Sequence, residues 1–254
     1  MTFPTGLHAE TIDEVIHSLD EIIIWAKAHN NRLGYFPSLY KKVTVAVKNG
    51  IAEGVFEDGK RMEKLDVIFA NRYLDAIEAY AVNKPVSASW EISFKAEKWW
   101  SPIVLQHLLS GMNAHIDLDL GIAAAEVMKG KHIEDLQPDF YKINEILFSL
   151  INEVQDELAE IWPPMKWIDR FAGTLDENLA KFGMKLTRNG AWDFAKRLAE
   201  TSESNWGTQI TKRNTEVADI GTFIVRPKFI ASFILFFIRI GEKGTIASRI
   251  QILN

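Results

Sequence analysis

Apolar residues spaced alternately three and four positions apart run through most of this 254-residue sequence. That spacing matches the turn of an α-helix and places the apolar side chains on one face. The clearest example lies between Pro138 and Pro163 and consists of Ile143, Leu147, Leu150, Val154, Leu158 and Ile161. No segment shows the two-residue alternation of a strand beside a hairpin turn. The pattern therefore predicts an all-α protein.

Start and stop signals divide this pattern into a bundle of roughly eight to ten helices. Thr11 and Glu14 form a capping box at the start of a helix over residues 11–29, and Thr174 with Glu177 forms a second box. The loops are short, and the sequence contains no repeat and no long linker. We therefore expect one helical domain over residues 1–254, with the Pro163–Pro164 pair as the best alternative boundary.

The composition excludes several classes of protein. Without Cys, the chain has no disulfide, no thiolate metal site and no cysteine nucleophile. Its net charge is -5, and its basic and acidic residues are interspersed without a Lys/Arg run, so nucleic acid is not an expected partner. No basic segment precedes an apolar core near the N-terminus, so we expect no signal peptide and a cytoplasmic protein.

One apolar segment, Phe229–Ile240, could be mistaken for a membrane span. It has twelve residues and contains Arg239, whereas a helix needs about 20 apolar residues to cross a bilayer. The sequence therefore predicts a buried helix here and no membrane span.

The stretch Gln106–Leu120 concentrates ligand-type side chains in an apolar setting. On a helix, His115 and Asp119 are four residues apart and share a face. His107 lies about 12 Å away from His115 along the axis, at 1.5 Å per residue. One metal ion could be bound by both histidines only if the helix bends near Gly111 or breaks before Asp117.

Imidazole and carboxylate together suit zinc, iron or manganese. Such a site needs three or four ligands, so other helices have to contribute; Asp66, Glu153 and Asp156 are the acidic candidates. Asp117 joins the set if the helix unwinds there, and Asn113 is a further candidate. The alternative is that these residues are core groups held by structural hydrogen bonds.

A second polar pair lies on the helix expected over residues 60–82. Asp66 and Arg72 flank its apolar stripe. Each lies about 60° around the helix axis from the stripe, counting ~100° per residue. They are either boundary charges that find nearby partners or the opposite wall of the site. In the second case Arg72 binds an anionic substrate group and Asp66 orients it.

Three blocks of the sequence resemble a known family. The first is Gly111–Ile116 followed by Asp119–Leu120, which reads GMNAHI-x-x-DL, and the second is Leu65–Tyr73. A weaker third match consists of Arg188, Ala191, Trp192 and Leu198. Together these blocks are similar to a bacterial, mainly helical family catalogued as a domain of unknown function. The resemblance implies a compact helical fold and supplies no activity; its members often carry Asn where this chain has Asp117.

The leading functional hypothesis is a metal-dependent, hydrolase-like enzyme acting on an unknown small molecule. His115 and Asp119 would hold the metal, and His107 would be a third ligand or a general acid/base. The sequence contains no serine-hydrolase, phosphate-loop or dinucleotide-binding motif. The alternatives are a binding module that holds an apolar small molecule between aromatic helices, and a structural component of an oligomer. The first hypothesis requires the two motif helices to lie against each other.

Overall fold

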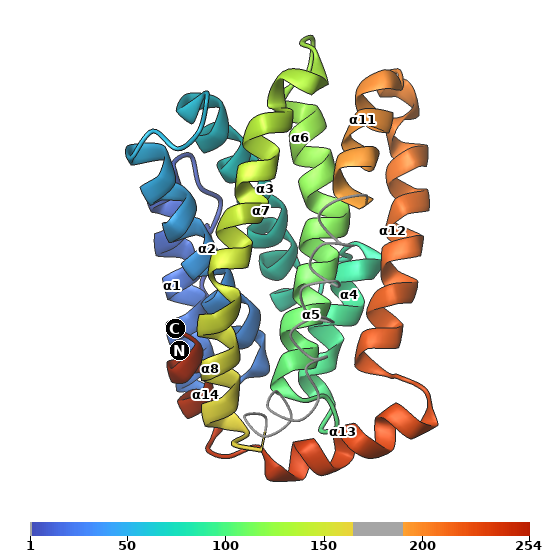
Figure 1. Cartoon of the computed structure of the whole chain (residues 1–254). Helices are drawn as coiled ribbons and strands as arrows, with labels where there is room; N and C mark the ends of the chain where they lie inside the picture. Colours follow the sequence, from blue (N-terminus) through green and yellow to red (C-terminus); the bar gives the residue numbers. More distant parts are fainter. Residues whose placement is uncertain (1, 165–189) are drawn as a thin grey trace.

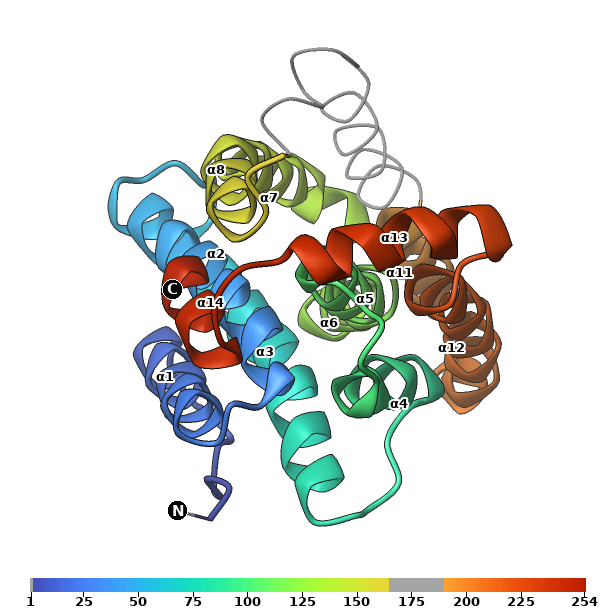
Figure 2. The same ribbon diagram turned by 90° about the horizontal axis from the view of Figure 1, so that it is seen from below.

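The computed structural model describes residues 2–164 and 190–254. These residues form helices, turns and loops and contain no strand, which confirms the all-α prediction. Long helices run side by side, and one helix, α13, lies across an end of the bundle (Figures 1 and 2). The capping box at Thr174 and the motif residue Arg188 lie outside the described residues.

The first half of the chain contributes the following elements: α1 (Ile12–Ala28), η1 (Arg32–Gly34), α2 (Tyr35–Ala52), α3 (Gly59–Ala81), α4 (Ala88–Lys95), η2 (Ala96–Lys98), α5 (Val104–Ala114), the π-helix η3 (His115–Leu120) and α6 (Gly121–Val127). The second half contributes η4 (Ile133–Leu136), α7 (Gln137–Ser149), α8 (Ile151–Ile161), α11 (Trp192–Glu200), α12 (Glu203–Val225), α13 (Phe229–Gly241) and α14 (Ile246–Leu253).

Thr11 caps α1 as predicted, but the reciprocal bond of the capping box does not form, because Glu14 Oε2 accepts from Glu10 N. The backbone N of Glu14 donates to Thr11 Oγ1 at 3.2 Å, which satisfies one of the free N–H groups at the helix start. The apolar stripe behind it is buried, including Val15, Leu19 and Ile22. Each such side chain contributes about 1.5–3 kcal/mol when it is fully removed from water.

The segment that carries the first motif is a continuous helical rod composed of α5, η3 and α6. It begins at Val104. The rod packs against α2, α3, α4, α11 and α12 and is therefore the centre of the bundle (Figure 2). Gly130, with φ +74°, ends the turn beyond α6.

The helix predicted between Pro138 and Pro163 is interrupted. α7 ends at Ser149, α8 begins at Ile151, and Leu150 between them has φ -87° and ψ -10°. The apolar stripe continues across the interruption, because Ile143 and Leu147 pack on the main core while Leu158 and Ile161 are buried under α14.

The prediction that Phe229–Ile240 forms a buried helix is wrong. The helix α13 forms, but Phe229, Phe233 and Ile240 are 87%, 60% and 60% exposed. Its buried residue is Arg239, which ion-pairs with Glu242. The apolar composition of the segment led to the error, because a helix with few charges is usually covered by other helices.

Among the residues that the structure describes, no helix combines the length and the apolar composition that crossing a membrane requires.

Close packing of α5 on α2 depends on Gly111. A Cβ atom at this position would overlap the Phe36 ring. We therefore expect Gly111→Ala to lower the free energy of unfolding by about 1–3 kcal/mol, the usual cost of overpacking. Urea denaturation measures the change.

The matched control is Gly207→Ala in α12, where no atom lies within 4 Å of the added methyl group. This variant should be about 0.4–1 kcal/mol more stable than wild type, because alanine favours the helix. Equal effects at the two positions would contradict the packing argument.

Candidate functional site

The Asp119 carboxylate lies in the interior of the bundle and is held by three side chains. Arg72 Nε on α3 donates to its Oδ1 at 3.0 Å, and Trp90 Nε1 on α4 donates to its Oδ2 at 2.8 Å. His115 Nδ1, one turn earlier, lies 3.3 Å from Oδ2. Both carboxylate oxygens are therefore engaged by groups from three separate helical segments.

The His115 ring is enclosed by aromatic side chains. It stacks on Phe69 with 3.6 Å between ring centroids and an interplanar angle of 9°. Tyr40 and Phe36 meet it edge-on, at centroid distances of 4.5 Å and 5.7 Å. Burial lowers the pKa of His115, although Asp119 opposes the change. Within the described part of the chain, no group hydrogen-bonds to its Nε2.

Asp66 lies one turn before Phe69 on α3 and is also buried. Burial raises the pKa of its carboxyl group to about 7, with a smaller contribution from Glu63. Its Oδ2 has no hydrogen-bond partner among the described residues. Burial, followed by the charge of Asp66, raises the pKa of Tyr40 well above its ordinary value. The charge of Asp66 therefore acts on Tyr40, whose ring contacts the His115 ring.

Two tyrosine hydroxyl groups add to this set of unsatisfied polar atoms. Among the residues described, neither Tyr40 OH nor Tyr73 OH has a hydrogen-bond partner. Burial also raises the pKa of Tyr73 well above its ordinary value. Both hydroxyls are therefore protonated and can donate. We call Asp66, Arg72, Trp90, His115 and Asp119 the His115 centre.

The local backbone explains how the motif presents its residues. His115–Leu120 form a π-helix inside a rod that is otherwise α-helical. Such segments are rare and frequently lie at functional sites. The first residue after the π-helix is Gly121, where a Cβ would meet the Phe194 ring at 2.7 Å. The rod therefore changes from π-helix to α-helix at the point where α11 packs closely on it.

Asp117 and Asn113 face a different neighbour. Arg213 on α12 donates from Nε to the Asp117 backbone oxygen at 2.8 Å, and its side chain approaches the Asp117 carboxylate at 3.4 Å. Asn113 Nδ2 donates to the Val217 oxygen at 2.9 Å. Burial raises the pKa of Asp117 to about 7, while Arg213 opposes the change. The segment does not unwind but forms a π-helix, so the condition for Asp117 to join His115 and Asp119 is not met and Asp117 faces α12.

His107 is separate from the His115 centre. The bend near Gly111 that a metal site shared by both histidines would need does not occur, because α5 is regular as far as Ala114. His107 lines a cavity of about 20 Å³, which is room for about one water molecule. Burial lowers its pKa to about 3, helped by the charges of Arg32 and Arg239. The remaining cavity walls are Arg32, Leu33, Phe36, Tyr73, Trp90, Ser93, Phe94 and Glu97.

The cavity and the His115 centre share a wall. Phe36, Tyr73 and Trp90 line the cavity and also contact the His115 ring, at centroid distances of 5.7, 6.1 and 5.8 Å. His107 and His115 therefore lie on opposite sides of one aromatic layer.

The described residues contain no group of three His, Asp or Glu side chains placed to hold one metal ion. Glu153 and Asp156, named above as acidic candidates, are exposed on α8. Glu153 is paired with Lys42 at 2.8 Å. In the described part of the chain, His115 Nε2 and Asp66 Oδ2 are both left without a hydrogen-bond partner.

The predicted juxtaposition of the two motif helices is confirmed by the contact of Arg72 with Asp119 and of Phe69 with His115. The prediction that Asp66 orients Arg72 has no contact to support it. Arg72 instead bonds to Asp119 and approaches Glu126 at 3.9 Å.

Sequence reasoning missed Trp90 as the donor to Asp119. A buried indole N–H needs an acceptor, which gives a reason to look for one. The spacing along the chain could not identify it, because Trp90 and Asp119 meet only through the packing of α4 on the rod. The same holds for Tyr40, which comes from α2.

The fold and this centre define a class of all-α bundle whose core contains a paired His and Asp beside an aromatic cavity. The chain belongs to the family of unknown function DUF5995, whose family model matches residues 12–227. No curated protein and no solved structure matches the chain. The matched range includes the His115 centre and ends before α13.

The buried Asp66 carboxyl should make stability depend on pH. Its pKa is about 7 in the folded protein against an ordinary value of 3.8, so the cost of burying its charge grows as pH rises from about 4 to about 7. Asp66→Asn removes this cost. Above pH about 8, the variant should be up to about 4 kcal/mol more stable than wild type, at 1.36 kcal/mol per pKa unit.

Urea denaturation at several pH values measures this difference, which should shrink towards pH about 4. The exposed Asp219 on α12 provides a control, because Asp219→Asn should change stability little at any pH. A constant difference between Asp66→Asn and wild type across this range would contradict the burial argument.

Proposed function

We propose that the chain is an acid–base enzyme in which His115 is the general base and Asp119 orients it. The observation that carries the proposal is the buried contact of His115 Nδ1 with Asp119 Oδ2 at 3.3 Å, on a ring whose Nε2 has no hydrogen-bond partner within the described residues. A carboxylate on one ring nitrogen and an open second nitrogen is the arrangement of a catalytic imidazole.

Each group has a chemical reason for its role. The Asp119 carboxylate accepts the Nδ1 proton, so Nε2 keeps its lone pair and can take a proton from water or a substrate hydroxyl. Asp119 then stabilises the imidazolium that forms. Arg72 and Trp90 hold Asp119 in position, and the stacked Phe69 ring fixes the plane of the imidazole.

Asp66 supplies the complementary acid. With a pKa of about 7, it is partly protonated near neutral pH and can return a proton to a leaving group. Tyr40 and Tyr73 offer neutral hydroxyl donors to the same core. This combination supports hydrolysis or a related proton-transfer reaction on a small substrate, with room for a water molecule in the adjoining cavity.

A metal-assisted version of this proposal would place the ion on His115 Nε2 and the Asp66 carboxyl. Asp119 would then support the imidazole from behind, as carboxylates do for many metal-bound histidines. Two donors are fewer than the three or four protein ligands that zinc takes. The metal-free version therefore fits the donor set better. The cavity beside His107 supports the alternative of an apolar-ligand module less well, because this cavity is far smaller than the ~300 Å³ of ordinary ligand pockets.

The tautomer of His115 tests the geometry without a substrate. Nitrogen NMR should show the proton on Nδ1 and a ring that becomes charged only at a lower pH than a free imidazole, because burial lowers the pKa of His115. Asp119→Asn should redistribute the proton between the two ring nitrogens. A wild-type ring protonated on Nε2 would contradict the proposal.

Hydrolysis of p-nitrophenyl acetate tests the chemistry. We expect His115→Gln and Asp119→Asn to lower kcat/KM by about 10²–10⁴-fold, the usual contribution of a general base. The matched control is Asp117→Asn, another buried aspartate of the same π-helix, which faces Arg213 and should leave the rate unchanged. Equal rates in wild type and a folded His115→Gln variant would contradict the proposal.

Element analysis of protein purified without a metal-affinity column separates the two versions. Stoichiometric metal that is lost in both His115→Gln and Asp66→Asn supports the metal-assisted version. A metal-free wild-type protein that hydrolyses the ester supports the acid–base version.

A further inference from the structure

The helix α13 presents apolar side chains to solvent on most of its circumference. Phe229, Ile230 and Phe233 are 87%, 77% and 60% exposed. The other exposed large apolar residues at this end of the bundle are Ile220, Phe223, Ile234, Phe236, Phe237, Ile240 and Trp100. We call these ten residues the α13 surface. Contiguous apolar patches of this kind mark sites of association.

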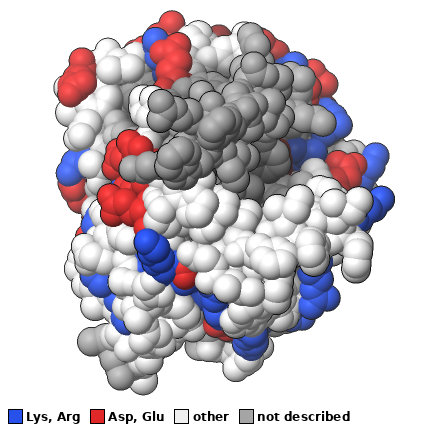
Figure 3. Space-filling model, turned by 60° about the horizontal axis from the view of Figure 1, so that its bottom comes forward, with Lys and Arg blue, Asp and Glu red and all other residues white. Residues whose placement is uncertain are grey.

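Basic residues flank α13 on both sides, and the nearest exposed acidic residue earlier in the chain is Asp219, next to Ile220. The sequence from Ile220 to Gly241 contains no Asp or Glu, although the whole chain has a net charge of -5. Arg226 and Lys228 are exposed just before α13, and Lys243 is exposed just after it. Glu242, the first acidic residue beyond this segment, is turned inward and paired with Arg239 and Arg249. Figure 3 shows a white area with Lys and Arg along its lower border and Asp and Glu at its left edge.

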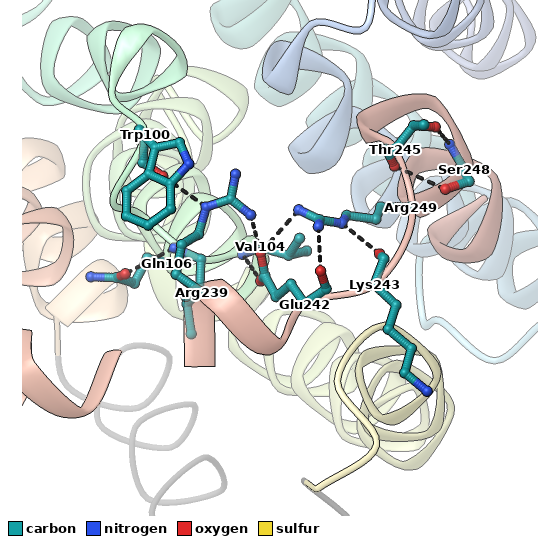
Figure 4. A network of polar contacts seen from close by, with 10 residues as sticks. Trp100, Val104, Gln106, Arg239, Glu242, Lys243, Thr245, Ser248 and Arg249 are labelled. Carbon is teal, nitrogen blue, oxygen red and sulfur yellow. Dashed lines mark hydrogen bonds and ion pairs between the residues drawn. The ribbon is translucent and has the colours of Figure 1, made fainter. Parts of the chain in front are cut away.

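A buried polar network fixes the direction in which α13 faces. Arg239 donates from Nε to the Trp100 oxygen at 2.7 Å and from Nη1 to Glu242 at 2.7 Å. Arg249 donates to the same carboxylate at 3.0 Å and to the Glu242 and Lys243 backbone oxygens at 2.8 Å each. Figure 4 shows these contacts converging on Glu242. They hold the polar side of α13 on the bundle and leave its phenylalanines outside.

The orientation of α13 suits a flat apolar medium. The helix lies across the end of the bundle, while the long helices run roughly perpendicular to it (Figure 1). A bilayer placed against this end would lie parallel to the α13 axis. Interfacial helices of this type bury their apolar face about 5–10 Å into the headgroup and acyl boundary.

We propose that the α13 surface docks on an anionic lipid membrane, with α13 lying in the interface and Arg226, Lys228 and Lys243 contacting the headgroups. The charge pattern favours this occupant over a second copy of the chain. Two copies packed through α13 would bring the basic residues Arg226, Lys228 and Lys243 of each copy towards one another, whereas anionic lipids neutralise them. The inference does not depend on the proposed activity, because the α13 surface and the His115 centre share no residue.

Sedimentation with vesicles tests the inference on the full chain. We expect binding to vesicles of phosphatidylcholine mixed with phosphatidylserine, and weaker binding to phosphatidylcholine alone. The triple variant Phe229→Ser/Phe233→Ser/Phe237→Ser should bind at least about tenfold more weakly for each side chain lost. Lys228→Gln and Lys243→Gln should each weaken binding about fivefold, and only to the anionic vesicles.

The control is Ile24→Ser/Val82→Ser, which removes exposed apolar side chains elsewhere, on α1 and just after α3; it should bind like wild type. Circular dichroism checks that every variant is folded. The inference is overturned if wild type binds neither kind of vesicle, or if the folded triple variant binds as wild type does. It is also overturned if sedimentation velocity shows a wild-type dimer that does not bind vesicles and that the triple variant dissociates.

Discussion

The core of this bundle depends on the buried Asp119 carboxylate and its three donors. Removing a charge from water costs several kcal/mol unless hydrogen bonds and an opposite charge compensate for it. Arg72 from α3, Trp90 from α4 and His115 from the rod provide that compensation. Because each donor comes from a different segment, one polar group fixes how α3 and α4 lie on the rod. Loss of a single donor would leave an incompletely paired group in an aromatic core.

Asp119 and Asp66 show that the hydrogen-bond donors around a buried carboxyl group determine whether it can exchange a proton. Both residues are buried beside the same aromatic rings, but Asp66 has an oxygen without a partner among the described residues and a pKa of about 7. A fully bonded carboxylate can orient a neighbour, whereas a poorly bonded one can exchange a proton near neutral pH. The π-helix contributes by turning Asp117 towards Arg213, so the two aspartates of η3 face different neighbours.

Local features of this fold could be predicted from the sequence, and features of tertiary packing could not. The Thr11 capping box and the three- and four-residue spacing predict α1 because a helix is built from near neighbours. The pairing of His115 with Asp119 follows from the same rule. Nothing in the spacing identifies Trp90 as a donor, since that contact depends on how α4 packs. The exposure of Phe229 was missed for a related reason: hydrophobicity indicates that a helix avoids water, but not what covers it.

The contact between Glu242 and the start of α5 has a consequence for the order of folding. The Val104 backbone N donates to Glu242 Oε1 at 2.6 Å, across a sequence separation of 138 residues. A helix N-terminus is usually capped by a residue beside it, and Ile103 at that position has no side-chain oxygen. The first turn of the central rod therefore lacks this hydrogen-bond acceptor until residue 242 has left the ribosome. The middle of the chain completes its structure late in synthesis, when the segment that closes it is made.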